Sequence, residues 1–197
     1  MILILGPAGS GKSLQGQFLA IRHGWTWVSV GRLLRRSNNL EIENLLKTGD
    51  LLPNKIVDHT LFKKLDEIFS LDKVIVDGYP RSLAQAKSLV NYVKKRNDGV
   101  GLPLIINLAL SDNKIIERLS KRGRMDDKPE AVKHRLSIYH QKSQAILDYY
   151  AANGVAIETV DADGKPGEVF DRIEAVIDSY WQSIKPNDLA FKEDIES

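Results

Sequence analysis

The chain opens with Met1-Ile-Leu-Ile-Leu5-Gly6-Pro-Ala-Gly9-Ser10-Gly11-Lys12-Ser13, the stretch that decides the fold. The apolar run at residues 1–5 is typical of a buried parallel strand, and a helix is expected from about residue 12 to 23. Between them, residues 6–13 match G-x-x-x-x-G-K-[S/T], in which glycines let successive backbone N–H groups point at phosphate oxygens. The start of the helix adds a positive dipole end, Lys12 a mobile charge, and Ser13 a hydroxyl within reach of Mg²⁺. Strand, loop and helix in this order predict binding of a nucleoside triphosphate, and an incidental Gly-rich turn is the alternative.

The composition is that of an ordinary globular protein, with 197 residues, 43% hydrophobic and 27% charged. The net charge of +2 is too small to favour nucleic acid or a membrane as a partner. There is no cysteine, which excludes disulfides and thiolate zinc sites and suits the reducing cytoplasm, where we expect the protein. The apolar run at 1–5 is too short for a signal peptide or a membrane span. The four histidines show no metal-ligand spacing: His23, His59, His134 and His140.

Beyond residue 23, strands and helices are expected to alternate. Further strands are expected at 25–30, 73–77, 104–110 and 155–160. Helices are expected through most of 31–69, with breaks at 37–39 and 49–53, and then at 81–96, 111–122, after 127, and 167–183. Asn54 is expected to cap one helix, and Asp127 with Glu130 to form a capping pair for another. Right-handed crossovers then give one α/β domain over 1–197, a doubly wound, five-stranded parallel sheet of the P-loop NTPase type with three layers, α/β/α.

Asp77 closes the strand expected at 73–77. Ligands of parallel sheets bind beyond the carboxyl ends of the strands, where the phosphate loop also lies. This is the position expected for an acid that holds Mg²⁺ or its water shell in phosphate-loop enzymes. The alternative is a carboxylate that caps the next turn.

Arginines cluster on both sides of the expected cleft. Arg118 and Arg122 lie four residues apart, hence on one helix face, Arg124 follows after a single glycine, and Arg135 lies on the next helix. A helical hairpin would bring all four over the phosphate loop, where phosphoryl transfer needs positive charge in bidentate geometry. Each arginine taken alone would be interpreted as a solvated side chain.

A second basic group is made by Arg35 and by Arg81, which follows Asp77-Gly-Tyr-Pro80. These two residues are candidates for binding the phosphate of an acceptor. Two basic groups around one triphosphate loop indicate two phosphorylated substrates, and therefore a kinase more than an NTPase.

With these residues assembled, the sequence resembles the short-lid form of the adenylate kinase (nucleoside monophosphate kinase) family from Met1 to about Tyr180. The most specific match is Asp77-Gly-Tyr-Pro-Arg81 with Gln85 four residues later. The other matching stretches are 6–15, 28–35, 49–53, 118–127, the Arg135-Leu136 pair and Asp163-Gly-Lys-Pro166. The resemblance implies a helical acceptor-binding insertion at 29–58, a very short lid at 122–129, and reversible transfer of the γ-phosphoryl group from Mg·ATP to AMP, giving two ADP. It also implies a monomer whose partners are these nucleotides.

The resemblance also implies roles for individual residues. ATP would be bound by Gly9, Ser10, Gly11, Lys12, Ser13, Leu14, Arg118 and Arg122, with the backbone of Lys165 against the adenine. AMP would be bound by Val30, Arg35, Leu52, Gly78, Arg81, Gln85, Arg124 and Arg135. The catalytic group would be Lys12, Arg81, Arg118, Arg122, Arg124 and Arg135, with Ser13 and Asp77 on Mg²⁺, through water.

Four departures from the family pattern keep alternatives open. Leu14 replaces a usual threonine in the loop, Val30 a usual threonine in the acceptor pocket, and Arg32 a usual aspartate. The lid is shorter than even the family's short form, which favours some ATP hydrolysis. Val30 favours a kinase of relaxed or different base specificity, although Gln85 favours adenine. The other departures favour a weakly catalytic nucleotide-binding protein. If Arg32 meets Arg124 as a like charge, Asp126 or Asp127 is expected to compensate.

Overall fold

The computed structural model describes residues 1–37, 40–48, 50–96, 103–124 and 127–183. Asp126, considered above, lies outside these residues, as does the tail from Lys185. None of the helices in these ranges combines the length and the hydrophobicity that a membrane-spanning segment needs.

The expected five-stranded parallel sheet is confirmed. Its strands are β1 (Ile2–Leu5), β2 (Thr26–Ser29), β3 (Val74–Asp77), β4 (Leu104–Ala109) and β5 (Ile157–Asp161). They lie in the order β2-β3-β1-β4-β5, and every neighbouring pair is parallel. Asp77 lies opposite Ile4 of β1 and Ser29 of β2. The first strand therefore ends beside Asp77, and the phosphate loop that follows leaves the sheet at the same edge.

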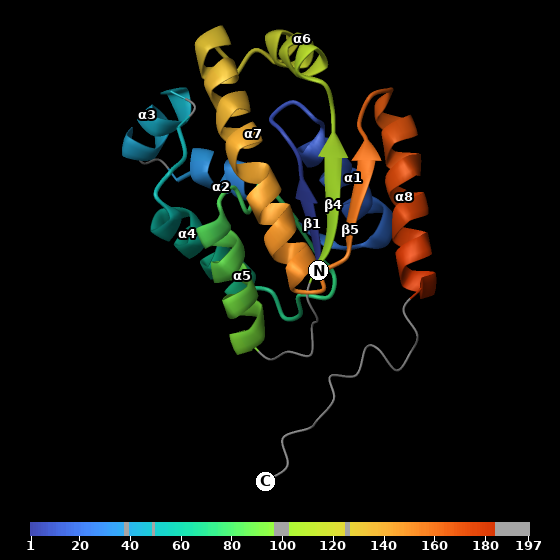
Figure 1. Ribbon diagram of the computed structural model, residues 1–197. Helices are drawn as coiled ribbons and strands as arrows, with labels where there is room; N and C mark the ends of the chain where they lie inside the picture. Colours follow the sequence, from blue (N-terminus) through green and yellow to red (C-terminus); the bar gives the residue numbers. More distant parts are fainter. Residues whose placement is uncertain (38–39, 49, 97–102, 125–126, 184–197) are drawn as a thin grey trace.

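Helices cover both faces of the sheet, as a three-layer fold requires (Figure 1). They are α1 (Lys12–His23), α2 (Val30–Arg35), α3 (Leu40–Thr48), α4 (Asn54–Asp66), α5 (Leu83–Arg96), α6 (Asp112–Arg122), α7 (Pro129–Ala152) and α8 (Pro166–Ser183). Successive residues of β1 point to opposite faces. Leu3 packs in a buried cluster with Ile146 of α7, whereas Ile4 packs in another with Leu19 of α1 and Ile173 of α8. Each face thus has its own apolar core, which is why the inner strands β1 and β3 are buried along their whole length.

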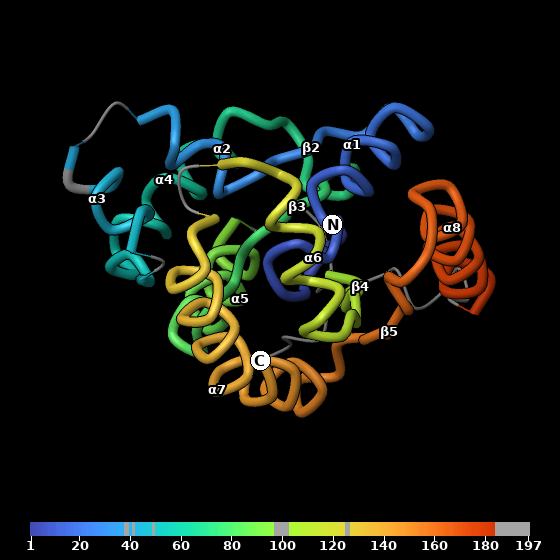
Figure 2. The backbone as a smooth tube through the Cα atoms, turned by 90° about the horizontal axis from the view of Figure 1, so that it is seen from above, coloured from blue at the N-terminus to red at the C-terminus, as the bar shows by residue number. Residues whose placement is uncertain are grey.

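Two helical groups flank the carboxyl end of the sheet. Seen from above, α3 lies at the far end of the molecule from α8, and α2 and α4 join it to the sheet (Figure 2). The hairpin of α6 and α7 is held by its own small cluster of Ile115, Leu119, Val132 and Leu136. This cluster fixes the direction in which the arginines of both helices extend.

Two expected helix caps are wrong. Lys128 is the residue that caps α7, without a side-chain hydrogen bond, and the carboxylate of Asp127 binds arginines instead. A carboxylate gains more from a full guanidinium charge than from one backbone N–H, so the ion pair prevails. Pro53 caps α4, and the side chain of Asn54 accepts a hydrogen bond from Ser82 at 3.0 Å.

Candidate active site

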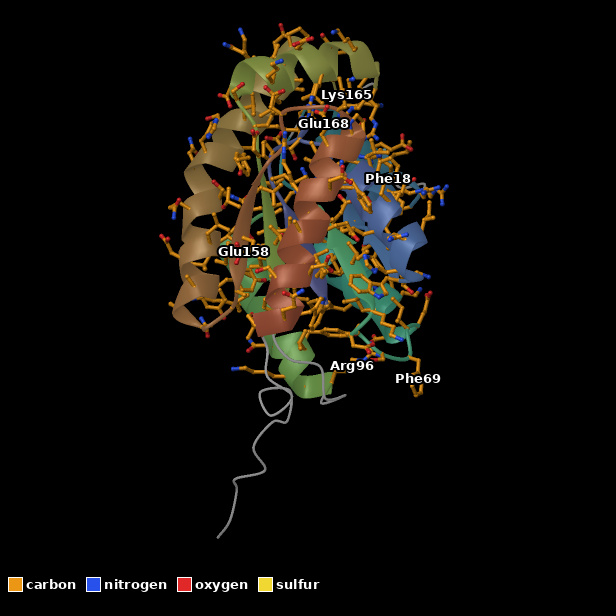
Figure 3. All side chains as sticks on the ribbon, turned by 90° about the vertical axis from the view of Figure 1, so that its right-hand side faces the viewer. Phe18, Phe69, Arg96, Glu158, Lys165 and Glu168 are labelled. Carbon is orange, nitrogen blue, oxygen red and sulfur yellow. The ribbon has the colours of Figure 1, made fainter. Side chains whose placement is uncertain are left out.

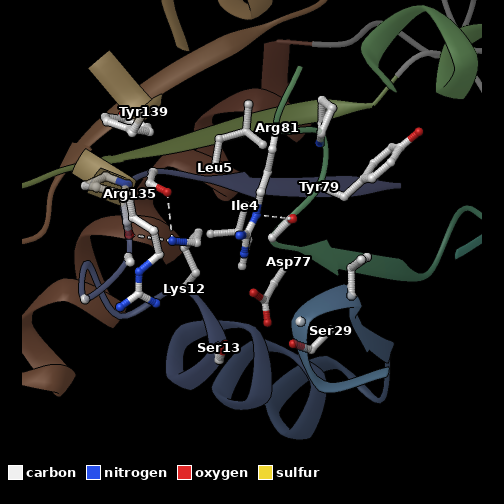
Figure 4. Close-up of a pocket in the computed structure, with 18 of the residues that line it drawn as sticks. Ile4, Leu5, Lys12, Ser13, Ser29, Asp77, Tyr79, Arg81, Arg135 and Tyr139 are labelled. Atoms are coloured by element: carbon white, nitrogen blue, oxygen red, sulfur yellow. Dashed lines mark hydrogen bonds between the residues drawn. The ribbon is translucent and has the colours of Figure 1, made fainter. Parts of the chain in front are cut away.

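A cavity of about 400 Å³ lies beyond the carboxyl ends of β1, β3 and β4 (Figure 4). Its walls come from the phosphate loop, from α2 and the connection between α3 and α4, and from α6 and α7. Segments from most of the chain's length therefore meet around one space, which is large enough to be a ligand site.

The phosphate loop has the curled backbone that its glycines allow. Gly9 and Gly11 have φ values of 86° and 97°, which a side chain would strain. Gly11 is also the N-cap of α1, so the helix begins at Lys12 with its positive end directed into the loop. The adjacent Ser10 is almost fully buried behind the loop and does not line the cavity.

Lys12 lies at the base of the cavity. Its Nζ donates hydrogen bonds to the carbonyl oxygens of Gly6, at 2.7 Å, and Pro7, at 2.5 Å. Burial lowers the pKa of Lys12 to about 7. The charge of Asp77 opposes this shift, whereas nearby guanidinium groups strengthen it. The negative charge of an incoming phosphate would strongly stabilise the protonated form of this buried lysine.

The four arginines of the α6–α7 hairpin reach the wall of this one cavity, together with two from the other side. The arginines that line it are Arg35, Arg81, Arg118, Arg122, Arg124 and Arg135. Arg81 is oriented by its Nε, which donates to Gly78 O at 3.0 Å, and Arg118 by its Nη2, which donates to Ala162 O at 2.9 Å. So many cations facing one space make it a site for polyanions.

Asp77 is 3% exposed and faces the cavity between Ser13 and Ser29 (Figure 4). Its Oδ2 accepts a hydrogen bond from the indole Nε1 of Trp27 at 3.0 Å. Within the described ranges, no group of three or more acidic or histidine side chains could hold a metal ion by itself. One carboxylate and one hydroxyl suit Mg²⁺, which keeps several waters and takes its other ligands from phosphates. The residues present therefore fit a magnesium ion that arrives with a nucleotide.

The side of the cavity formed by α2 to α5 is largely apolar. Val30 and Leu52 are buried there, and Gln85 is 2% exposed. The Oε1 of Gln85 accepts a hydrogen bond from Arg81 N at 2.7 Å. Since the carbonyl end of the amide is engaged, its NH₂ end is the part available to a ligand. Gly78 lies at the turn between this pocket and Asp77.

Lys165 does not line the cavity. It precedes α8, where its backbone N–H donates to the carboxylate of Glu168 at 2.9 Å, and the two residues lie close together at the start of that helix (Figure 3). Its neighbour Pro166 accepts a hydrogen bond from Gln15 Nε2 at 2.9 Å, which ties this turn to α1. Lys165 directly follows Gly164, whose carbonyl oxygen accepts a hydrogen bond from Nη2 of the cavity-lining Arg118 at 3.3 Å.

Two features of the site escaped the sequence analysis. Tyr139 and Ser143 of α7, to which the sequence analysis assigned no role, are half-buried and line the cavity. Their signal was their helical spacing from Arg135, at four and eight residues. The hydrogen bond between Trp27 and Asp77 left no recognisable pattern in the sequence, because it joins residues 50 positions apart.

Arg32 and Arg124, considered above as a pair of like charges, both line a second pocket, which Glu43 also lines. The guanidinium of Arg32 lies over the indole of Trp27, with Cζ 5.6 Å from the ring centroid. Asp127 accepts a hydrogen bond from the backbone of Arg124 at 3.2 Å. Its carboxylate also binds the side chains of Arg122 and Arg135.

Comparison with known proteins gives a consistent result. The family model described as adenylate kinase matches residues 4–155. The adenylate kinase of Mycolicibacterium vanbaalenii is 37% identical over 177 residues, which are 87% of this chain and 95% of that protein. The adenylate kinases of Mycobacterium leprae and Mycobacterium tuberculosis are 35% and 33% identical, with the same coverage of both chains.

Proposed function

Because this chain belongs to the adenylate kinase family of nucleoside monophosphate kinases, we propose that the cavity of about 400 Å³ is its active site. The activity is that of an adenylate kinase, reversible transfer of a phosphoryl group between ATP and AMP. The observation that carries the assignment of the site is the meeting of Lys12 with six arginines around one space. This concentration of positive charge suits two phosphorylated substrates better than one.

The phosphate loop binds the triphosphate in this proposal. Backbone N–H groups at Gly9 and Gly11 and the start of α1 hold phosphate oxygens, and Lys12 leaves the carbonyl oxygens of Gly6 and Pro7 to reach the outer phosphates. The other ATP-binding residues in this proposal are Ser13, Leu14, Arg118 and Arg122, which line the cavity, together with Ser10 and Lys165, which lie just outside its lining, Lys165 with its backbone against the adenine. Leu14 is 40% exposed and lines the cavity, where it offers contact but no hydroxyl.

The opposite side of the cavity binds the acceptor. Arg35, Arg81, Arg124 and Arg135 hold its phosphate, and the apolar surface of Val30 and Leu52 receives its base. The free NH₂ group of Gln85 can donate to a ring nitrogen of adenine, and Gly78 leaves room for the ribose. The support for this arrangement is that the apolar and the cationic parts of the cavity lie next to each other.

Catalysis needs little covalent help from the protein, because the transferred group carries charge that positioned cations stabilise. Lys12 and the guanidinium groups of Arg81, Arg118, Arg122, Arg124 and Arg135 supply that charge in the proposal. A magnesium ion held by Ser13 and Asp77, the latter through water, would neutralise charge on the phosphates. The segments 29–58 and 122–129 act as the acceptor-binding insertion and the lid that exclude water.

We also propose that the protein works as a monomer in the cytoplasm. One chain supplies the phosphate loop, all six arginines and the apolar pocket, so the site needs no second copy. The absence of cysteine suits a reducing compartment.

The proposal is tested by following diphosphate formation from Mg·ATP with AMP, GMP, CMP and UMP in turn. ADP formation with AMP and little reaction with the other acceptors is expected. Comparable turnover of another monophosphate would assign a broader acceptor pocket, and no turnover with any of them would overturn the proposal.

The roles of the residues are tested in the same assay. Lys12→Met and Arg81→Ala should each lower the rate by at least ~100-fold, about 2.7 kcal/mol of transition-state stabilisation. The exposed Lys63→Met and Arg22→Ala are matched controls, since neither residue lines the cavity. Full activity in the first pair would show that the site is misassigned.

A further inference from the structure

Trp27 contacts the buried acid of the site from the neighbouring strand. Its indole Nε1 donates a hydrogen bond to Oδ2 of Asp77 at 3.0 Å. In the parallel pair β2–β3, Ser29 lies opposite Asp77, and Trp27 lies two residues earlier, so it projects on the same face of the sheet as Ser29. The indole therefore reaches along the strand to a carboxylate one strand away.

The half-buried indole is contacted by the two helices that adjoin it. A Cβ atom at Gly16 of α1 would lie 2.7 Å from both Cδ1 and Nε1 of Trp27, closer than atoms can approach. Arg32 of α2 lies over the ring from its own side, with Cζ 5.6 Å from the centroid. A glycine inside a helix is unfavourable compared with alanine, and here the close approach of the indole requires it.

The carboxylate of Asp77 has a competing partner. The charge of Asp77 acts on Lys12, and both residues line the same cavity. A carboxylate free to turn would be drawn to the ammonium, and the lysine would then be less available to phosphate. In the part of the chain that the structure describes, Trp27 is the residue that donates a hydrogen bond to this carboxylate.

We propose that Trp27 is a positioning residue for magnesium: its N–H fixes Oδ2 of Asp77 and leaves Oδ1 for the ion or its water. Gly16 and Arg32 hold the indole in place for this task. The inference rests on the proposed role of Asp77 in magnesium binding. In this inference Trp27 orients the carboxylate of Asp77 without itself contacting the nucleotide or the metal.

The test compares two substitutions of Trp27 by calorimetric binding of ADP with and without Mg²⁺. Trp27→Phe keeps an aromatic ring and removes the N–H. Trp27→His keeps a ring N–H, because imidazole Nε2 is two bonds from Cγ, as indole Nε1 is. The matched control is Trp25→Phe, whose ring stacks on His23 away from the cavity.

Mg²⁺ increases the affinity for ADP, and we expect this increase to be at least ~5-fold smaller in Trp27→Phe than in the wild type. The affinity for ADP without Mg²⁺ should change less than ~2-fold. Trp27→His should recover most of this gain in affinity from Mg²⁺, and Trp25→Phe should behave as the wild type. In kinetic assays, the Mg²⁺ concentration for half-maximal rate should rise in Trp27→Phe while the KM for AMP stays unchanged. An equal loss in the histidine and phenylalanine variants would overturn the inference, because the loss would then follow from the volume of the indole.

Asp77→Asn separates this inference from the role on which it rests. If Mg²⁺ increases the ADP affinity of Asp77→Asn as much as that of the wild type, then Asp77 does not help to bind magnesium, and Trp27 cannot position it for that role. If Asp77→Asn loses the gain but Trp27→Phe keeps it, only the present inference is overturned. Should Trp27→Phe fail to fold, Gly16→Ala displaces the indole without removing it, and an undiminished gain in that variant would overturn the inference equally.

Discussion

The carboxylate of Asp127 contacts the guanidinium of Arg122 at two points, with Nε donating to Oδ2 at 2.7 Å and Nη2 donating to Oδ1. Arg135 donates to the same Oδ1 at 3.2 Å, and the side chain of Asp127 is 3% exposed. Although desolvation opposes it, the hydrogen bond and charge of Arg122 hold the pKa of the Asp127 carboxyl below its usual range. An acid thus occupies the place between two arginines proposed to bind phosphate.

Asp127→Asn should destabilise the protein and increase its response to nucleotide. Without the carboxylate, two arginines near Lys12 lose their counter-charge, which we expect to lower the free energy of unfolding by about 1–3 kcal/mol. Saturating ADP should restore part of the loss, because its phosphates replace the carboxylate. Thermal unfolding with and without ADP measures both effects. In the wild type, this contribution is present above the unfolded pKa of about 3.9 and is lost as the pH falls below it.

The control for this variant is Asp112→Asn, which removes an exposed carboxylate that pairs with His140. Asp112→Asn should change neither the midpoint of thermal unfolding nor the increase in that midpoint that ADP produces. Equal ADP shifts in Asp127→Asn and the wild type would contradict the idea that Asp127 stands where phosphate binds.

Nucleotide binding should take up a proton at Lys12 above pH 7. Burial lowers the pKa of Lys12 to about 7 in the unliganded site, and the negative phosphates of ATP raise it again. Between pH 7 and 9 the free protein lacks a proton that the complex holds, so affinity falls as the pH rises. Calorimetry in two buffers of different ionisation enthalpy measures the uptake. Proton uptake that persists undiminished in Lys12→Met would refute the assignment.

The sheet and the phosphate loop could be predicted because their signals are local. The central strands β1, β3 and β4 are short, mostly apolar runs followed closely by a glycine or a polar residue, and helix α1 begins at Lys12 as the loop pattern requires. The arginines of the α6–α7 hairpin were also accessible, since spacing places Arg118 and Arg122 on one helix face.

The contacts that orient these groups depend on long-range geometry and could not be predicted. Asp127 with Glu130 fits a capping pair equally well in the sequence, and only the approach of Arg122 and Arg135 decides against it. Trp27 meets Asp77 because β2 and β3 are neighbours in the sheet order, which no local pattern specifies. The glycine at position 16 has meaning only beside that indole.

Gln85→Glu should weaken the binding of AMP selectively. A glutamate keeps an oxygen for the N–H of Arg81, which Gln85 Oε1 accepts at 2.7 Å, but it loses the NH₂ group that faces the pocket. We expect the KM for AMP to rise at least ~10-fold, about 1.4 kcal/mol, with the KM for ATP changed less than ~2-fold. Steady-state kinetics measure both constants. Gln141→Glu, on the exposed face of α7, is the matched control, and an unaltered KM for AMP in Gln85→Glu would place the base elsewhere.

Without an acceptor, the enzyme should slowly hydrolyse Mg·ATP. A single residue, Gly123, separates Arg122 from Arg124, and both arginines are exposed, so the proposed lid covers the transferring group with little chain. Water that reaches an activated phosphoryl group competes with AMP for it. Phosphate release measured without AMP should therefore exceed the background of Lys12→Met, and added AMP should divert the phosphoryl group to ADP. Release no faster than that of Lys12→Met would show that the short lid excludes water as well as a longer one, since the same arginines would then suffice to close the site.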